Sequence, residues 1–332
     1  MVELSYDVPV QEGELVKEGP KRAAKPVQDL DALLFKERMI DHYAGRESGL
    51  FIILPEGQRL FEVLKGLVEE RIGRALGYIP ITLPKISPVD TFRKANILGK
   101  WDGYLERVQP FSATNGVKED YLMEPLQCTP LYQYLEGRVL DASDGPLKLY
   151  DASGPTYRNE DTEEISPLIK QREFHRSEFM YLGTKEQVIS SREETLAKLE
   201  DLCDSLSMQY RIVVGSGCYQ ISDDDILFPK TAEEISIKDL EVHIPAGFDK
   251  RGERMHHLEV AGAAALGDIQ AKRFNICASD GGHLWSGCVG VGLERLMYAF
   301  LAHHGFDKAA WPEIVKDKYE RAYEGMEAAR WL

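Results

Sequence analysis

Apolar residues recur at helical spacing in long segments toward both ends of the chain. Between residues 57 and 76 they fall four positions apart along one stripe, which predicts an amphipathic helix that ends before Gly77. From Leu293 onward they follow an i, i+3, i+4, i+7 pattern, and Gly305 marks the end of this second helix. A third helix is predicted over residues 186–206.

The middle of the chain is dominated by short segments that are typical of strands. The predicted strands cover residues 147–150, 156–160, 172–182, 210–214, 240–244, 273–277 and 284–292, with a proline-interrupted edge strand over 79–86. The connections look like hairpins, such as the charged stretch 161–167. This order of elements predicts an α+β fold, in which an antiparallel sheet is flanked by helices, and not a doubly wound parallel sheet.

Composition limits the size and the partners of the protein. The chain has 332 residues, of which 43% are hydrophobic, so it can bury a sizeable core in one large domain or about two smaller ones. The 40 Lys and Arg residues against 55 Asp and Glu residues give a net charge of −15. Such an acidic protein repels phosphate backbones on average, which argues against a nucleic-acid partner unless a local basic groove overrides the average.

The compartment can be inferred from what the sequence contains. No apolar run approaches the roughly 20 residues of a membrane helix, and the polar, acidic start is not a secretory signal. The cysteines form an odd, sparse set in which no pair has Cys-x-x-Cys spacing: Cys128, Cys203, Cys218, Cys277 and Cys288. A cytoplasmic protein without a membrane partner is therefore expected.

A glycine-rich segment, Gly290-Val-Gly292-Leu-Glu-Arg295, lies where the last predicted strand passes into a helix. On a strand Cys288, Gly290 and Gly292 share one face, and the two glycines leave a floor where another molecule can approach closely. Arg295 then falls in the first helical turn, where a cation is mildly unfavourable unless a polyanion such as a triphosphate lies nearby. A tight strand–helix corner with a surface arginine is the alternative interpretation.

A second group of polar residues lies on two neighbouring predicted strands. Arg158 and Glu160 share one face of the first strand, and four residues share a face of the second: Arg172, Phe174, Arg176 and Glu178. The arginines could hold phosphate and the phenylalanine could stack on a base, so the pair could bind a nucleotide. A cross-strand salt-bridge ladder on a solvated face remains equally open.

Together these segments resemble class II aminoacyl-tRNA synthetases of the seryl type, over roughly residues 50–310. The run from Gly77 to Pro84 is similar to the dimer-forming first motif, the stretch from Arg158 to Phe174 to the second, and the glycine-rich segment to the third. The order and number of these motifs carry the resemblance. It implies the class II catalytic core, an antiparallel sheet flanked by helices, and a homodimer.

The resemblance also implies a zinc site. Cys128 in Pro125-Leu-Gln-Cys128 and Glu178 in Glu173-Phe-His-Arg-Ser-Glu178 are similar to segments of zinc-dependent threonyl and methanogen-type seryl enzymes. Zn²⁺ is expected on Cys128, Glu178 and a second cysteine, for which Cys288 beside the glycine floor is preferred to Cys277. Three protein ligands leave a fourth position for a substrate. Ordinary buried thiols are the alternative.

Several residues match the nucleotide site of the resembled family. The implied ATP-binding residues are Arg158, Glu160, Phe174, Glu259 and Arg295. Of these, Arg158, Glu160 and Arg295 are expected to be catalytic, with Arg158 at the α-phosphate and Arg295 at the γ-phosphate. Phe174 would stack on adenine, and Glu259 would bind Mg²⁺, whose second family ligand, a serine, is replaced here by Gly262.

The expected organisation is a lead-in segment over residues 1–48 and a catalytic domain over 49–332, without a tRNA-binding arm. Such a short core resembles amino acid:[carrier protein] ligases. The resemblance implies activation of glycine or alanine by ATP, with release of pyrophosphate, and transfer to the phosphopantetheine thiol of a carrier protein; tRNA is not expected as a partner. The alternatives are a compact seryl-type aminoacyl-tRNA synthetase and a non-catalytic paralogue.

Overall fold

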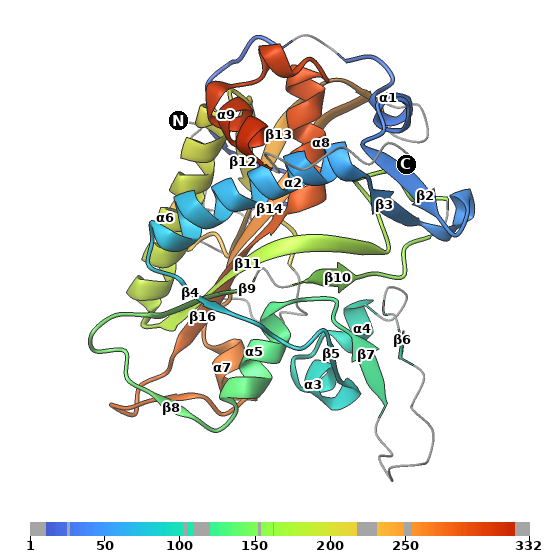
Figure 1. Ribbon diagram of the computed structural model, residues 1–332. Helices are drawn as coiled ribbons and strands as arrows, with labels where there is room; N and C mark the ends of the chain where they lie inside the picture. The colour runs from blue at the N-terminus through green and yellow to red at the C-terminus, as the bar shows by residue number, and fades with distance from the viewer. Residues whose placement is uncertain are drawn as a thin grey trace.

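The fold is built around a nine-stranded sheet (Figure 1). The computed structural model describes residues 11–24, 27–101, 105, 107–108, 120–151, 154–161, 163–217, 231–248 and 254–322. In spatial order the strands of the sheet are β1 (Leu15–Glu18), β12 (Tyr210–Val214), β13 (Ile237–Phe248), β14 (Arg254–Ala265), β16 (Trp285–Gly292), β11 (Glu173–Gly183), β9 (Leu147–Asp151) and β4 (Ile79–Ile81), and β10 (Pro155–Tyr157) also pairs with β11. Every pairing is antiparallel except β4–β9. The predicted α+β fold with an antiparallel sheet is confirmed.

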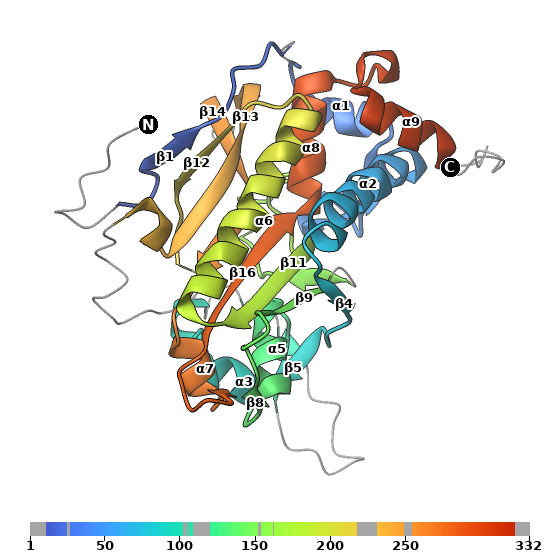
Figure 2. The ribbon, with the colours of Figure 1, turned by 90° about the vertical axis from the view of Figure 1, so that its left-hand side faces the viewer.

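Long helices cover one face of this sheet (Figure 2). They are α2 (Pro55–Val68), α6 (Lys185–Ser205) and α8 (Leu293–His304), and α9 (Glu313–Arg321) packs against α2. Their apolar stripes bury Leu64, Leu196 and Met297, each at most 3% exposed, in the main core. Burial of each such side chain contributes about 1.5–3 kcal/mol.

Local sequence explains where these helices begin and end. Pro55 occupies the first turn of α2, and α6 starts with a capping box in which the Thr184 side chain accepts from Gln187 N while the Gln187 side chain accepts from Thr184 N. Gly305, at φ 64°, ends α8. The helix predicted over 57–76 is α2 followed by a π-helical turn, η2 (Glu69–Arg74).

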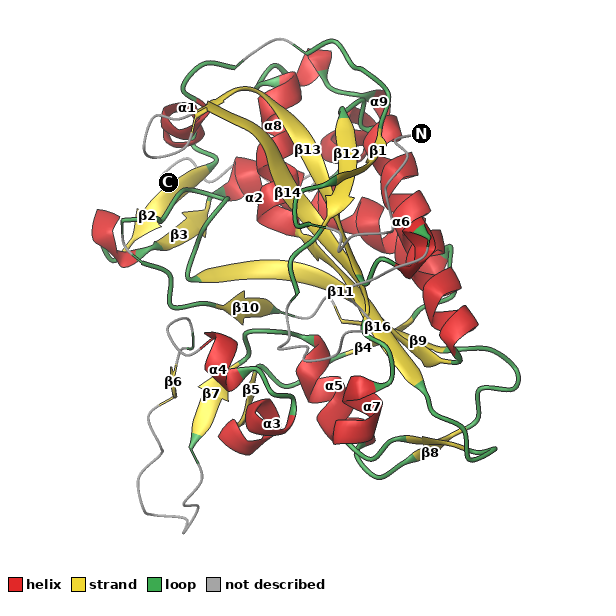
Figure 3. Cartoon of the chain, turned by 180° about the vertical axis from the view of Figure 1, so that it is seen from behind, coloured by secondary structure: helices red, strands yellow, loops and turns green. Residues whose placement is uncertain are grey.

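The opposite face carries smaller elements around a second apolar cluster (Figure 3). These are the helices α3 (Val89–Lys94), α4 (Leu98–Trp101), α5 (Cys128–Leu135) and α7 (Ile269–Arg273), and two small sheets, β5 (Ile86–Pro88)–β7 (Tyr121–Met123)–β6 (Arg107–Val108) and β15 (Cys277–Ala278)–β8 (Val139–Leu140). The strand predicted over 273–277 is therefore wrong for most of its length. Ala271 and Phe274 lie three apart and are both buried, which suits a helical turn.

Residues from the predicted lead-in take part in the fold. Leu15–Glu18 form β1 at the edge of the main sheet, and Leu34 of α1 (Leu30–Lys36) is fully buried. A short two-stranded sheet, β2 (Ile40–Tyr43)–β3 (Leu50–Ile53), crosses the expected boundary at residue 48. The described residues of this segment therefore pack with the rest of the fold. The division into 1–48 and 49–332 stays a prediction.

Two further expectations concern membranes and thiols. Among the described residues, no helix combines the length and apolarity that crossing a bilayer requires. No disulfide joins any of Cys128, Cys203, Cys277 and Cys288, and Cys218 lies outside the described residues.

Candidate active site

Two thiols and one carboxylate converge on the face of the sheet opposite the long helices. Glu178 on β11 pairs with Gly290 on β16, and Cys288 precedes Gly290 by two residues on the same face. Cys128 is the first residue of α5. One ligand atom from each of Cys128, Glu178 and Cys288 lies within 4.8 Å of the others, and all three residues are buried. Strand pairing thus brings Glu178 and Cys288 together, and the start of α5 adds Cys128.

Gly290 leaves the space that Glu178 occupies. A Cβ at this position would lie 2.5 Å from Glu178 Oε2 and 3.1 Å from Arg176 Cδ. The glycine floor predicted from the sequence is therefore covered by side chains of the neighbouring strand.

The donor atoms of this cluster fit a zinc ion. Glu178 is 2% exposed, and within the described residues its Oε2 makes no hydrogen bond, although Arg176 Nε lies 3.2 Å away. A buried carboxylate oxygen without a hydrogen bond is costly, and a bound cation would satisfy it. Two thiolates and a carboxylate form a ligand set that Zn²⁺ accepts. Cys277 is exposed on β15, so Cys288 is the cysteine that lies in the cluster.

A cavity of about 320 Å³ is lined both by the expected zinc ligands and by the residues expected to bind ATP. The eight residues expected to bind zinc or ATP all line it: Cys128, Arg158, Glu160, Phe174, Glu178, Glu259, Cys288 and Arg295. The structure brings these residues together, and their individual roles stay predictions.

Arg158, Glu160 and Phe174 border one part of this cavity. Arg158 donates from Nε to the Pro125 carbonyl at 3.2 Å, and its guanidinium carbon lies 5.8 Å from the centroid of the Phe174 ring. Glu160 is 8% exposed, and its Oε2 lies 3.4 Å from Lys170 Nζ. Cationic, aromatic and acidic groups therefore face the same space, as a nucleotide would require.

Arg295 and Glu259 are paired with one another. Arg295 Nη1 lies 3.0 Å from Glu259 Oε2, and Arg295 Nε donates to the Ile169 carbonyl at 3.0 Å. The side chains are 34% and 47% exposed, so this ion pair is weak and can open for a phosphate or a metal ion. The pairing also offsets the unfavourable position of a cation in the first turn of α8.

Asp239 also lines this part of the cavity, and the sequence did not identify it as a site residue. It pairs with Gly262 across β13 and β14, and a Cβ on Gly262 would lie 3.2 Å from Asp239 Oδ1 and 3.7 Å from Glu259 Oε1. Burial, reinforced by repulsion from Glu259, raises the pKa of Asp239 to about 8. Carboxylate oxygens are the ligands that Mg²⁺ prefers, so the pair fits this cation although the family serine is missing.

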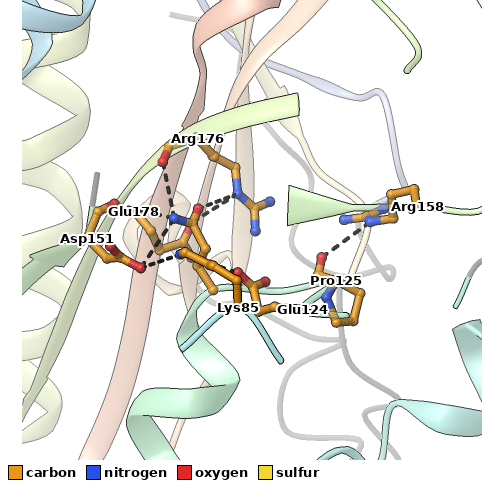
Figure 4. Close-up of polar contacts among 8 residues, drawn as sticks. Lys85, Glu124, Pro125, Asp151, Arg158, Arg176 and Glu178 are labelled. Atoms are coloured by element: carbon orange, nitrogen blue, oxygen red, sulfur yellow. Dashed lines mark hydrogen bonds and ion pairs between the residues drawn. The ribbon is translucent and has the colours of Figure 1, made fainter. Parts of the chain in front are cut away.

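A buried polar network lies next to Glu178, which contacts Arg176 (Figure 4). Lys85 Nζ lies 2.6 Å from Asp151 Oδ2 and 3.6 Å from Glu124 Oε2, and both carboxylates are fully buried. Burial raises the pKa of Glu124 to about 8, although Lys85 and Arg176 oppose the shift. Of these residues only Arg176 belongs to a polar pattern in the sequence, because no local motif connects the others.

Comparison with known proteins identifies the family. A family model described as "tRNA synthetase class II core domain (G, H, P, S and T)" matches residues 111–304, more than half of the 332 residues. The chain belongs to this class II synthetase family. This ligase family and the class II core fold are what the sequence resemblance implied.

The curated relatives of this class II core include type-2 serine–tRNA ligases from archaea. The enzyme of Methanopyrus kandleri is 27% identical over 349 residues, which cover 96% of this chain and 65% of the relative. That of Methanocaldococcus jannaschii is 26% identical over 321 residues, which cover 88% of this chain and 59% of the relative. The chain thus spans less than two thirds of the length of these relatives.

Solved structures show the same similarity. The M. kandleri SerRS, in a complex with A. aeolicus tRNASec, matches with a TM-score of 0.84 and 25% identity over 98% of this chain and 67% of that one. The Pyrococcus horikoshii seryl-tRNA synthetase, complexed with ATP, matches with a TM-score of 0.73 over 94% of this chain and 73% of that one. At 18% identity, the second match supports the fold alone.

These relatives overturn the expected partners of the class II core. A carrier protein was expected as the partner and tRNA was not, but the relatives are tRNA ligases, and one was solved with a bound tRNA. The expectation rested on the expected lack of a tRNA-binding arm and on the net charge of −15, which averages over the whole surface and says nothing of a local binding face.

Proposed function

We propose that this chain activates a small amino acid with ATP, as an aminoacyl adenylate, and transfers it to tRNA, with serine as the first candidate. The observation that carries the proposal is the convergence of Cys128, Glu178 and Cys288 in a cavity that Arg158 and Arg295 also line. The serine–tRNA ligases among the relatives support the choice of amino acid and acceptor.

The two sides of the cavity would hold the two substrates. Zn²⁺ bound by Cys128, Glu178 and Cys288 would supply an electrophilic position for the α-amino group of the amino acid. Arg158 would hold the carboxylate against the α-phosphate. A carboxylate oxygen then forms a bond to the α-phosphorus while the bond to the bridging oxygen breaks and pyrophosphate leaves. Little proton transfer is needed, so positioning and charge neutralisation carry the rate.

The remaining residues would hold the nucleotide. Phe174 would stack on adenine, Glu160 would contact its amino group, and Arg295 would move from Glu259 to the γ-phosphate. Asp239 and Glu259 would hold Mg²⁺, which would neutralise charge on the phosphates. The family resemblance implies the roles of Phe174, Glu160, Glu259 and Arg295. The position of these side chains and of Asp239 around one cavity supports them.

Glycine and alanine form the second candidate substrate class. Residues 262–265 are Gly, Ala, Ala and Ala, where the resembled seryl sequence carries polar residues. Polar groups of the site that bind a substrate hydroxyl give strong discrimination, and their loss favours substrates without a hydroxyl.

An ATP–pyrophosphate exchange screen over all standard amino acids tests the activation step, with zinc content measured in parallel. We expect serine-dependent exchange by a protein with about one zinc ion per chain, and we expect Cys128→Ala to lose both. Exchange with glycine or alanine alone would select the second candidate. Exchange with no amino acid would refute the proposal and support a non-catalytic paralogue.

A charging assay tests the acceptor. Radiolabelled amino acid and ATP are incubated with the enzyme and bulk tRNA, and acid-precipitable label is counted. We expect label on tRNA, in a reaction that weakens as salt rises because phosphate contacts are screened. A chain that catalyses exchange but labels no tRNA would contradict this acceptor.

A further inference from the structure

Gln127 lies at the meeting point of the two chain segments that supply Cys128 and Glu178. It is fully buried and immediately precedes Cys128, at the start of α5. Its Oε1 accepts a hydrogen bond from Arg176 Nε at 3.4 Å, and the same Nε lies 3.2 Å from Glu178 Oε2. One amide side chain therefore connects the neighbour of one ligand with the charge partner of another.

The same amide also joins two strands where their pairing ends. Asp151, the last residue of β9, lies opposite Glu178, and Gln127 Nε2 donates to the Asp151 carbonyl at 3.4 Å and to the Arg176 carbonyl at 3.2 Å. The amide thus continues the hydrogen bonding of β9 and β11 beyond their last pair. The individual contacts are long. Removing the amide would still cost stability, because two carbonyl groups inside the protein would lose a hydrogen-bond donor.

Two carboxylates face one another in this arrangement, so each needs a cationic partner. Asp151 and Glu178 are directly opposite on neighbouring strands, where like charges destabilise a sheet. Lys85, at 2.6 Å, offsets the first carboxylate, and Arg176 offsets the second. The Arg176 side chain does so from above Gly290, with Cδ 3.1 Å from where a Cβ would be. Gln127 holds the Arg176 Nε from the other side.

We propose that Gln127 is a positioning residue that fixes Arg176 and, through it, the orientation of Glu178 relative to Cys128. The proposal rests on the zinc site of the proposed function and adds a residue that touches neither metal nor substrate. Groups that orient metal ligands without binding the metal commonly change metal affinity by about 10- to 100-fold.

The test is the zinc affinity of Gln127→Met, which keeps the length of the side chain and removes both hydrogen-bonding groups. Zinc dissociation is measured by competition with a chromogenic chelator, and the visible spectrum of the cobalt-substituted protein reports ligand geometry. We expect zinc affinity to fall by about 10-fold or more, with a shifted cobalt spectrum. We also expect KM for the amino acid to rise while KM for ATP stays unchanged.

The matched control is Gln133→Met on the same helix. Its side chain contacts Thr91 and Glu136 away from the cavity, so zinc affinity should stay at the wild-type value. If Gln127→Met does not fold by circular dichroism, Gln127→Asn replaces it, because it draws the amide back by one methylene and carries the same expectation.

A double-mutant cycle with Arg176→Met decides whether Gln127 acts through Arg176. In the Arg176→Met background, the Gln127 substitution should change zinc affinity by less than about threefold. An equal loss in both backgrounds would overturn the proposal, as would a Gln127→Met protein that matches Gln133→Met. A wild-type chain that binds no zinc would instead refute the metal site of the proposed function.

Discussion

Cys288 and Cys277 differ in position although both are small thiols near the third motif. Cys288 is buried on β16 within the ligand cluster, whereas Cys277 is exposed on β15. We expect Cys288→Ala to lose bound zinc and pyrophosphate exchange, because two ligands hold the ion too weakly. Cys277→Ala is the matched control and should keep both. Atomic absorption measures the zinc bound per chain. Equal zinc contents in the two variants would contradict the site.

Glu124 should make stability depend on pH. Burial raises its pKa to about 8 in the folded chain, against about 4.3 for an unperturbed glutamate. Between these values the folded chain holds a proton that the unfolded chain has lost, so stability falls as pH rises through this window. Glu124→Gln keeps a neutral side chain throughout. We therefore expect its unfolding midpoint to exceed that of the wild type by a few degrees at pH 8 and by little at pH 5.

Thermal unfolding monitored by circular dichroism between pH 5 and pH 8 measures this difference. Glu62→Gln, at an exposed position on α2, is the control and should follow the wild type. Parallel curves for Glu124→Gln and wild type would show that the buried carboxyl does not bind the extra proton.

The site was predictable where residues belong to recognisable motifs. Cys128, Glu178 and Cys288 were found because their short segments resemble those of zinc-dependent synthetases. Lys85 and Asp151 were not, because they lie 66 positions apart. Asp151 pairs with Ile81 at the end of β4, four residues before Lys85. No local pattern encodes which strands become neighbours, so polar networks between strands are invisible to motif reading.

Where strands β11 and β16 pair, the position of Glu178 depends on Gly290 having no side chain. A Cβ at Gly290 would lie 2.5 Å from Glu178 Oε2, whereas a Cβ at Gly292 would lie 3.7 Å from the nearest atoms of Arg295. Gly290→Ala should push Glu178 away and lower zinc affinity by about 10-fold or more, whereas Gly292→Ala should change it little. Chelator competition on both folded variants measures this, and equal affinities would contradict the geometry.

Elements were predicted well where the local pattern agrees with the packing. The strand expected over 210–214 is β12, with the same bounds. β14 (Arg254–Ala265) was missed because residues 260–265 are mostly alanine and glycine, which have low strand propensity. The small side chains suit its place between β13 and β16, where Ala263 is fully buried. Tertiary packing thus overrides local preference there.

At the scale of the whole molecule, the charge of this protein has to be considered locally. The net charge of −15 argued against a nucleic-acid partner unless a local basic groove overrides the average, and the relatives are tRNA ligases. At physiological salt, screening limits the range over which a surface charge acts to about 8 Å. A basic face can therefore bind phosphate although the protein as a whole is acidic. A sum over the sequence cannot locate such a face.

The outer edge of the main sheet is where we expect two copies to associate. β4 pairs with β9 on one side, and no strand pairs with its other side in the described part of the chain. An unpaired edge with apolar residues favours association. Ile79 on β4 is 59% exposed, and four of the exposed large hydrophobic residues lie on β4, β5, α5 and β8 in one half of the molecule (Figures 1 and 2).

A charged residue in this edge should therefore separate the copies. Ile79→Glu would place an unpaired carboxylate in the expected interface, so the solution mass should fall from that of a dimer to that of a monomer. Ile52→Glu on β3 is the matched control, because Ile52 is 44% exposed on the separate β2–β3 sheet, and it should stay dimeric. Light scattering during gel filtration measures the mass. A monomeric wild type, or an Ile79→Glu protein that remains a dimer, would place the interface elsewhere.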